Sequence, residues 1–238
     1  LPSMSDYGLQ TLQYSDIAEE IAKLHIIFDN SGIKKGDKIA ICSRNMSRWG
    51  VAFLATLTYG AVAVPILHEF HPEQIQHIVN HSESRILFVG DLVWKKINAN
   101  EMPNLEGIIQ LNDWTLLSAK NNKLKDTVEN LNKCFGEKYP TSFGKKDIAY
   151  HADEPEELAI INYTSGTTSN SKGVMIPYRA ILSNMQFGRK ALPQLDSSSR
   201  VISMLPCAHM YGLMFEVLYE LSVGCHVHFL SRLPSPKI

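Results

Sequence analysis

Short apolar runs alternate with amphipathic segments along most of the chain, and this alternation constrains the fold more than any other feature. Residues 14–30 carry apolar side chains at helical spacing, and the run Ile39-Ala40-Ile41 after them is typical of a buried strand. The same order recurs to the end of the chain. We expect helices at residues 14–30, 47–59, 72–81, 91–98, 120–138, 178–192 and 211–222, and strands at residues 38–43, 61–66, 85–89, 107–111, 158–162, 200–205 and 224–230. Such alternation is typical of βαβ units, so the sequence predicts an α/β fold with mostly parallel sheets flanked by helices.

A loop rich in hydroxyl groups and glycine follows the strand expected at residues 158–162. It reads Tyr-Thr-Ser-Gly-Thr-Thr-Ser-Asn-Ser-Lys-Gly-Val-Met over residues 163–175, and no Asp or Glu occurs between Glu157 and Asp196. Hydroxyl groups and the main-chain N–H groups of a glycine-containing turn can converge on an anion, and Lys172 adds a positive charge. A second apolar run leads out of the loop, which favours a hairpin tip over a flexible linker. The pattern therefore predicts a site for a phosphate chain.

The loop does not fit the Walker A pattern of P-loop nucleotide hydrolases, which requires Gly, four residues, Gly, Lys and then Ser or Thr. Gly166 stands six residues before Lys172, Ser171 occupies the place of the second glycine, and Gly173 stands where the magnesium-binding hydroxyl should be. A Walker-type hydrolase is therefore disfavoured.

The loop resembles the hallmark motif of the adenylate-forming enzymes, which include acyl-CoA synthetases, firefly luciferase and the adenylation domains of peptide synthetases. That hallmark reads Tyr-Thr-Ser-Gly-Thr-Thr, a few small residues, then Lys-Gly-Val. Here it is complete except that Ser171 stands where proline is common before the lysine. In the family, the loop holds the β- and γ-phosphates of ATP while a carboxylate attacks the α-phosphorus. The resemblance therefore assigns phosphate binding to Thr164, Ser165, Gly166, Thr167, Thr168 and Lys172.

The resemblance extends over nearly the whole chain. Residues 58–65 are similar to a family segment that reads Lys-Ala-Gly-Ala-x-x-Val-Pro, and residues 14–43 follow the helix, turn and strand with which these enzymes commonly begin. It implies that residues 1–238 are the partial N-terminal AMP-binding domain, about the first half of such an enzyme. It also implies that the adenine, magnesium and lid residues lie beyond Ile238, so that this chain alone would be inactive.

A second motif, Leu-Pro-Cys-Ala-His-Met-Tyr-Gly, occupies residues 205–212 after an expected strand. Taken alone, His209 is more often a hydrogen-bonded residue that caps the following helix. The motif resembles the family's Leu-Pro-Leu-x-His followed by an aromatic residue and Gly or Glu, in which the histidine and its neighbours line the acyl pocket. The resemblance makes His209 the candidate catalytic residue, beside the carboxylate that becomes adenylated.

Other histidine patterns do not indicate a metal site. His77 and His81 are four residues apart on one expected helix, but no Glu lies between them and no third ligand is evident. His226 and His228 alternate on one face of an expected strand, and they do not indicate a metal site either. We therefore predict no metal site in these residues. The sequence also lacks the Gly-x-Ser-x-Gly elbow of serine hydrolases.

Composition excludes several classes of partner. The chain has 45% hydrophobic residues and a formal net charge of −1, which gives no electrostatic footprint for nucleic acid or for an anionic membrane surface. No apolar run approaches the ~20 residues that span a bilayer, and the first residues do not resemble a signal peptide. The cysteines are scattered without a Cys-x-x-Cys pair, which suggests neither a zinc ribbon nor a disulfide scaffold. We expect a cytoplasmic protein.

The resemblance implies an ATP-dependent acid–thiol ligase that uses ATP, Mg²⁺ and coenzyme A. Residues 58–89 and 206–212 look most like those of long-chain fatty acid–CoA ligases, so the expected acid is a fatty acid. Three alternatives stay open: a fatty-acyl-AMP ligase that hands its product to a carrier protein, an aryl-acid CoA ligase, and a non-catalytic module that keeps the phosphate loop.

Overall fold

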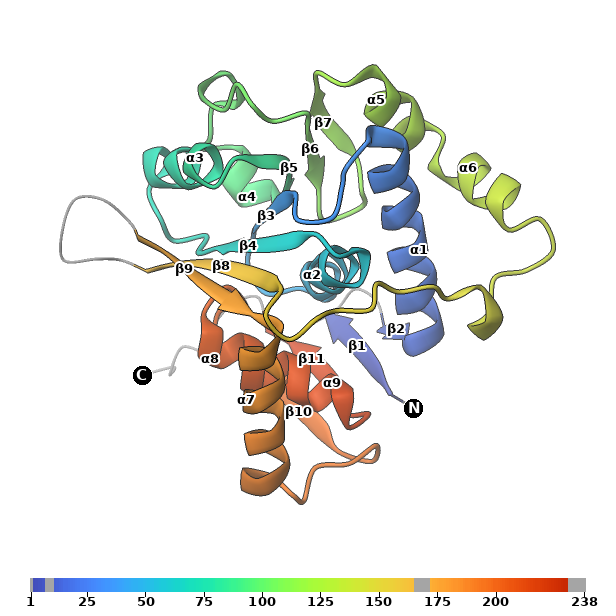
Figure 1. Ribbon diagram of the computed structural model, residues 1–238, viewed down its shortest axis with the longest axis vertical. Coiled ribbons are helices and arrows are strands. Elements are labelled where there is room, and N and C mark those ends of the chain that lie inside the picture. Colours follow the sequence, from blue (N-terminus) through green and yellow to red (C-terminus); the bar gives the residue numbers. More distant parts are fainter. Residues whose placement is uncertain (1, 7–10, 165–171, 231–238) are drawn as a thin grey trace, which may run out of the picture.

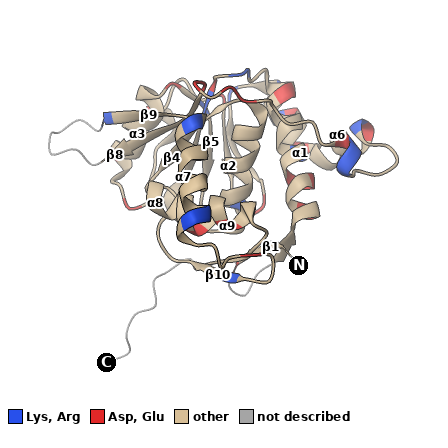
Figure 2. Cartoon of the chain, turned by 60° about the horizontal axis from the view of Figure 1, so that its bottom comes forward, with Lys and Arg blue, Asp and Glu red and all other residues tan. Residues whose placement is uncertain are grey.

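The computed structural model describes residues 2–6, 11–164 and 172–230, whose strands form two sheets (Figure 1). The larger sheet has the strand order β7-β6-β5-β3-β4-β8-β9, and the smaller has the order β10-β11-β1-β2. Charged residues lie mainly on the helices and connections around the larger sheet, with both signs interspersed (Figure 2). No helix within the described ranges has both the length and the apolar character needed to cross a bilayer.

The larger sheet is mostly parallel. Its strands are β3 (Lys38–Cys42), β4 (Val62–Ile66), β5 (Ser84–Val89), β6 (Gly107–Gln110), β7 (Leu116–Ala119), β8 (Leu158–Thr164) and β9 (Lys172–Pro177). Strands β3, β4, β5, β6 and β8 run parallel, while β7 and β9 at the two sides are antiparallel to their neighbours. Every residue of β4 is buried. This burial on both faces explains why these strands read as continuous apolar runs.

Helices cover both faces of the larger sheet. They are α1 (Tyr14–Ser31), α2 (Ser47–Tyr59), α3 (Pro72–His81), α4 (Asp91–Trp94), α5 (Asn122–Glu129) and α6 (Leu131–Lys138), with short 3-10 turns η1 (Ala99–Glu101) and η2 (Lys145–Asp147). Alternate residues of a strand point to opposite faces. Thus Ile39 and Ile41 of β3 pack in the core with α1 and α2, while Ala40 and Cys42 pack in the core with α3 and α4.

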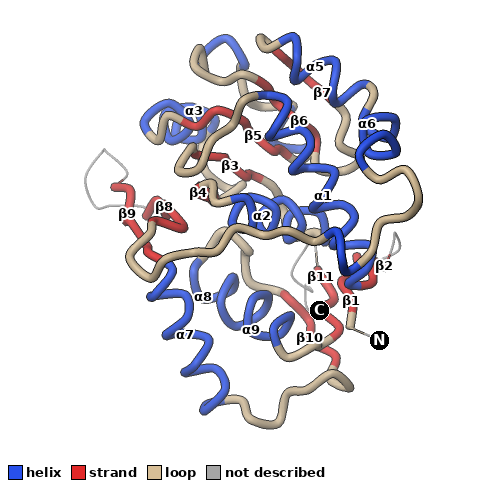
Figure 3. Tube along the Cα trace, turned by 45° about the vertical axis from the view of Figure 1, so that its right-hand side comes forward, coloured by secondary structure: helices blue, strands red, loops and turns tan. Residues whose placement is uncertain are grey.

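The smaller sheet packs against the other side of α2, so that α2 lies between the two sheets (Figure 3). Its strands are β1 (Ser3–Asp6), β2 (Thr11–Gln13), β10 (Arg200–Ser203) and β11 (His226–Phe229). A Cβ atom at Gly50 of α2 would lie 3.1 Å from Sδ of Met4 and 3.8 Å from the ring of Phe229. The glycine therefore allows the helix to approach the sheet closely.

The remaining helices lie beside the smaller sheet (Figure 1). They are α7 (Tyr178–Ala191), α8 (Met210–Leu213), the π-helical turn η3 (Met214–Leu218) and α9 (Tyr219–Ser222). The last three form one continuous helical segment where the sequence predicted a single helix at residues 211–222. Phe187 of α7 packs edge-on against Phe215 of η3, with ring centroids 6.1 Å apart.

The α/β class with parallel strands is confirmed, but several element predictions were wrong. The helix expected at residues 120–138 is two helices, because Asn130 leaves the helical conformation and its side chain donates to the Asp126 carbonyl oxygen at 2.9 Å. The helix expected at residues 91–98 ends at Trp94. Strands β1, β2 and β7 were not predicted. In β1 the sequence Ser-Met-Ser-Asp offers only Met4 as an apolar side chain, and the strand forms because β11 and β2 pair with it on either side.

Candidate functional site

The predicted phosphate loop joins β8 to β9, which form an antiparallel hairpin with Thr164 opposite Lys172. Because β8 runs parallel to β4, its end lies at the carboxyl edge of the larger sheet, where open α/β sheets bind ligands. Both Thr164 and Lys172 are exposed there. Four further predicted phosphate-binding residues, Ser165, Gly166, Thr167 and Thr168, lie outside the described residues. The structure thus places the two ends of the predicted loop at the expected edge.

A buried tyrosine packs at the loop end of this hairpin. Tyr163 is 4% exposed, and its hydroxyl group lies 2.7 Å from Nδ1 of His81 on α3. Burial raises the pKa of Tyr163, which keeps the phenol protonated and able to donate this hydrogen bond. A Cβ atom at Gly173 would lie 2.9 Å from Cγ2 of Ile161 and 3.1 Å from Cζ of Tyr163. The glycine after Lys172 therefore leaves room for the tyrosine ring beside β9.

Two asparagines hold the second motif in place. The Asn45 side chain, after β3, donates to the Leu205 carbonyl oxygen at 2.7 Å and accepts from the Cys207 backbone N–H at 2.9 Å. Asn162, in β8, donates from Nδ2 to the Ala208 carbonyl oxygen at 3.1 Å. Asn162 is 8% exposed and precedes Thr164 by two residues. The strand that leads into the phosphate loop is therefore hydrogen-bonded to the residue before His209.

Sequence reasoning missed both asparagines. Asn162 interrupts an otherwise apolar strand, and a polar residue in a buried strand needs a hydrogen-bond partner. Asn45 comes three residues after the parallel strand β3, at the edge where functional side chains gather. These two positions were the signals available in the sequence. Neither of them identifies the backbone groups to which the asparagines are hydrogen-bonded.

His209 is exposed and also caps α8. Its Nδ1 atom accepts from the Tyr211 backbone N–H at 3.3 Å, so the capping role that the sequence allowed is present in the structure. Its Nε2 atom has no hydrogen-bond partner within the described part of the chain. The exposed imidazole therefore keeps one nitrogen that a ligand could contact.

Close backbone packing gives the second motif its shape. A Cβ atom at Gly212 would lie 2.7 Å from the Pro206 carbonyl oxygen, so no larger residue fits without a shift. On the approach to the motif, Oε2 of Glu216 accepts from the backbone N–H groups of Met204 and Leu205 at 2.7 and 2.8 Å. The loop before His209 is thus fixed from both ends.

Four acidic residues that precede β8 lie at the opposite, amino edge of the sheet: Asp153, Glu154, Glu156 and Glu157. Glu157 directly precedes β8. Its Oε1 atom lies 2.6 Å from Nζ of Lys35, and its Oε2 atom lies 3.0 Å from Nε2 of His151. The hydrogen bond from His151, with that from Lys35, lowers the pKa of Glu157 to about 2. A seven-residue strand spans roughly 20 Å, so this carboxylate is far from the phosphate hairpin.

Histidine pairs in the structure are engaged with protein groups. The rings of His77 and His81 have centroids 5.6 Å apart, and His81 is bonded to Tyr163. His226 and His228 bond to serine hydroxyls of β1. Within the described ranges, no three His, Cys, Asp or Glu side chains are placed to hold a metal ion together.

Relatives of known name share about a quarter of their aligned residues with this chain. Long-chain-fatty-acid–CoA ligase 1 of Homo sapiens is 28% identical over 241 residues, which cover 93% of this chain and 32% of that protein. Long-chain-fatty-acid–CoA ligase of Escherichia coli O157:H7 is 26% identical, with 81% of this chain and 37% of that protein covered. The chain thus spans about a third of the length of these relatives.

Solved structures share the fold. ATP-bound MatB from Rhodopseudomonas palustris superposes with a TM-score of 0.76 at 18% identity, covering 98% of this chain and 42% of that one. An anthranilate CoA ligase, AuaEII, in complex with anthranoyl-AMP gives a TM-score of 0.79 at 17% identity, covering 98% of this chain and 41% of that one.

The sequence profile of one family, described as AMP-binding enzyme, matches residues 2–238. This match covers both the hairpin at Thr164 and Lys172 and the second motif around His209. The chain belongs to the AMP-binding enzyme family.

Proposed function

We propose that the protein of which this chain is part activates a fatty acid with ATP, forming an acyl-adenylate, and transfers the acyl group to coenzyme A. The observation that carries the proposal is the hydrogen bond from Asn162 to the Ala208 carbonyl oxygen. It joins the strand of the phosphate hairpin to the loop of His209, so a phosphate site and an acyl site would be held side by side. The named fatty acid–CoA ligases among the relatives support a fatty acid as the substrate.

The proposed phosphate site consists of Thr164, Ser165, Gly166, Thr167, Thr168 and Lys172. In adenylation a carboxylate oxygen forms a bond to the α-phosphorus, and the bond from that phosphorus to the leaving pyrophosphate breaks. Negative charge shifts onto the pyrophosphate, so donors placed at its oxygens stabilise the transition state more than the ground state. Lys172, exposed at the start of β9 and free of ion pairs within the described residues, would supply the positive charge.

His209 would contact the acid near its carboxylate. Its Nδ1 atom is used in the cap of α8, which orients the ring and leaves Nε2 toward solvent and ligand. Asn45 and Asn162 would act as positioning residues, because they hydrogen-bond to the backbone of Leu205, Cys207 and Ala208.

The proposed site residues that the structure describes at the carboxyl edge offer magnesium no carboxylate ligand. Mg²⁺ prefers carboxylate and water oxygens, and Thr164, Lys172 and His209 at this edge provide no carboxylate. We therefore assign no step of the reaction to the metal here, and propose that its ligands, the coenzyme A site and the lid lie in other parts of the protein. The 238-residue chain alone would then be inactive.

All four cysteines are free thiols, which supports a cytoplasmic compartment.

Acid-dependent exchange of labelled pyrophosphate into ATP tests the proposal. The assay compares this chain with the longest natural form of the protein, using palmitate, octanoate, acetate, benzoate and amino acids. We expect exchange with palmitate or octanoate in the long form and none in this chain. Exchange with benzoate alone would favour the aryl-acid ligase, and no exchange with any acid in either form would favour the non-catalytic module. Release of acyl-CoA then separates a CoA ligase from a fatty-acyl-AMP ligase.

A further inference from the structure

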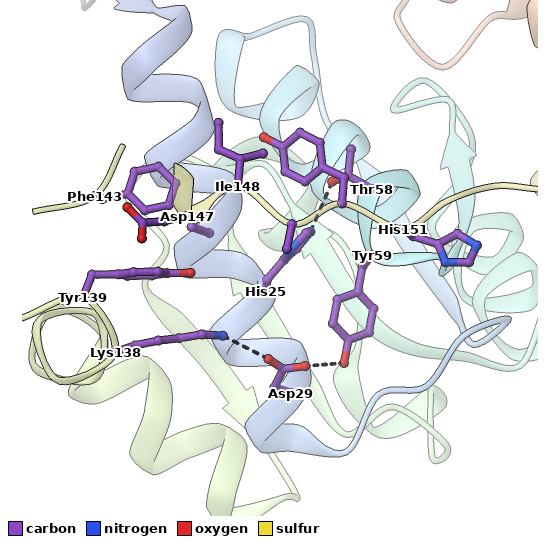
Figure 4. Close-up of a pocket in the computed structure, with 13 residues that line it drawn as sticks. His25, Asp29, Thr58, Tyr59, Lys138, Tyr139, Phe143, Asp147, Ile148 and His151 are labelled. Carbon is purple, nitrogen blue, oxygen red and sulfur yellow. Dashed lines mark hydrogen bonds and ion pairs between the residues drawn. The ribbon is translucent and has the colours of Figure 1, made fainter. Parts of the chain in front are cut away.

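A pocket of about 610 Å³ (Figure 4) is lined in part by residues of α1 and of the end of α2. It lies at the amino edge of the larger sheet, away from the phosphate hairpin. It is bounded by α1, the end of α2, the end of α6 and the connection at residues 139–151. Helix α2 starts near the carboxyl edge and ends at Tyr59 in the pocket, so its length of roughly 20 Å separates the two sites. The volume lies within the range of small-molecule sites in proteins.

Aromatic rings form two walls of this pocket. On one wall His25 lies 5.3 Å from Tyr59 and 6.1 Å from Tyr150, measured between ring centroids. On the other wall Tyr139 packs edge-on against Phe143 at 5.0 Å. Figure 4 shows Tyr139 and Tyr59 on opposite sides, with His25 between them. Flat apolar ligands fit between walls of this kind, and the ring faces attract cations.

The charged groups of the pocket favour a cation over an anion. Asp29 accepts from the Tyr59 hydroxyl at 2.8 Å and pairs with Nζ of Lys138 at 3.3 Å, so these two charges offset each other. Asp147 accepts from the Gly144 N–H at 2.9 Å through one oxygen, and no cation pairs with it within the described residues. Burial lowers the pKa of His25, which leaves the ring neutral near pH 7. Asp147 thus has no ion-pair partner within 4 Å among the described residues, although Lys145 and Lys146 precede it in the same turn.

We propose that this pocket binds a planar aromatic cation, with its ring between the Tyr59 and Tyr139 walls and its positive group beside Asp147. The site is independent of the proposed function, because α2 separates it from the phosphate hairpin by roughly 20 Å and its ligand is a cation, whereas ATP, a fatty acid and coenzyme A are anions. Its ligand therefore belongs to a different chemical class from the substrates of the phosphate hairpin.

Benzamidine, benzamide and benzoate provide a matched set of probes, because they have nearly the same shape and carry charges of opposite sign or none. Each is titrated into the 238-residue chain, and binding is followed by ligand-observed NMR. We expect benzamidine to bind at least about fivefold more tightly than benzamide, and benzoate not to bind. Equal binding of benzamidine and benzoate, or no binding of benzamidine up to about 10 mM, would overturn the proposal.

Three variants test whether the probe binds in this pocket. Asp147→Asn keeps an acceptor for Gly144 but removes the charge, so it should weaken benzamidine about three- to fivefold and leave benzamide unchanged. Tyr139→Ala should weaken both probes, because it removes one wall. Asp126→Asn, at an exposed position of α5 outside the pocket, is the matched control and should change neither. Unaltered benzamidine binding in both pocket variants, with native circular dichroism, would place the probe elsewhere and contradict the assignment.

Discussion

The two edges of the larger sheet use polar residues in opposite ways. At the carboxyl edge Thr164, Lys172 and His209 are exposed, and Lys172 has no ion-pair partner within the described residues. At the amino edge Glu157 is paired with Lys35 and His151. Groups that face a ligand keep donors and charge available, whereas groups that fix a connection use them within the protein. The exposed groups support the phosphate site proposed at the carboxyl edge, whereas the ion pairs of Glu157 stabilise the fold at the amino edge.

At the amino edge, a backbone contact also ties α2 to the connection that leads to β8. The His151 backbone N–H donates to the Thr58 carbonyl oxygen at 2.8 Å, and its ring lies over Gly60. Gly60 ends α2 with φ of +84°, in the left-handed region that favours glycine. A Cβ atom there would approach the ring of His151 to 2.9 Å. Conformation and packing thus both require glycine where α2 meets the connection to β8.

The largest expected effect is at the unpaired lysine of the carboxyl edge. Lys172→Ala in the longest natural form should reduce pyrophosphate exchange by roughly 100- to 1,000-fold, because it removes a positive charge at the developing pyrophosphate. Lys190→Ala, which removes an exposed lysine from α7, is the control and should leave the rate unchanged. Wild-type pyrophosphate exchange by the Lys172→Ala protein would contradict the assignment of the phosphate site to the carboxyl edge.

Glycine packing beside that lysine should affect stability. Gly173→Ala introduces a methyl group 2.9 Å from Ile161 and 3.1 Å from Tyr163, and we expect it to destabilise the chain by about 1–3 kcal/mol in urea unfolding. The matched substitution Gly136→Ala in α6 has no heavy atom within 4 Å of the new Cβ atom. It should raise the free energy of unfolding by about 0.5–1 kcal/mol. Equal effects at the two sites would contradict the packing account of Gly173.

The hydrogen bond between the two motifs should matter for both stability and activity. Asn162→Ala leaves the Ala208 carbonyl oxygen without its partner, which should cost about 1–2 kcal/mol of unfolding free energy. In the long form it should also lower fatty acid-dependent exchange by displacing the loop of His209. Asn184→Ala on exposed α7 removes a comparable side-chain bond, to the Ala180 carbonyl oxygen, and should be nearly neutral in both assays. Loss of stability with unchanged exchange would confine Asn162 to a structural role.

The sequence predicts most of the larger sheet because each buried strand is a continuous apolar run. The ends of the phosphate loop were also predictable, since strand, hydroxyl-rich loop and second apolar run fix a hairpin at Thr164 and Lys172. Its contact with the second motif was not, because Asn162 and Ala208 are 46 residues apart and only the fold brings them together. Strand β1 escaped prediction for the same reason, since its partner β11 lies at the other end of the chain.

The smallest effect concerns the ion pairs of the amino edge. The pKa of Glu157 is lowered to about 2 in the folded chain, chiefly by the hydrogen bonds from His151 and Lys35. A carboxyl group with a lowered folded pKa stabilises the protein above its unfolded pKa, and this stabilisation is lost as the pH falls toward the folded value. Glu157→Gln should therefore reduce stability by less than about 1 kcal/mol at neutral pH and flatten the stability profile between pH 5 and pH 2. Glu137→Gln, in an exposed pair on α6, should leave that profile unchanged.

Because the amino edge is remote from the hairpin, pyrophosphate exchange by the Glu157→Gln long form should match that of the wild type. A fall in exchange as large as that of Lys172→Ala would mean that the two edges are coupled through β8 rather than separate in function.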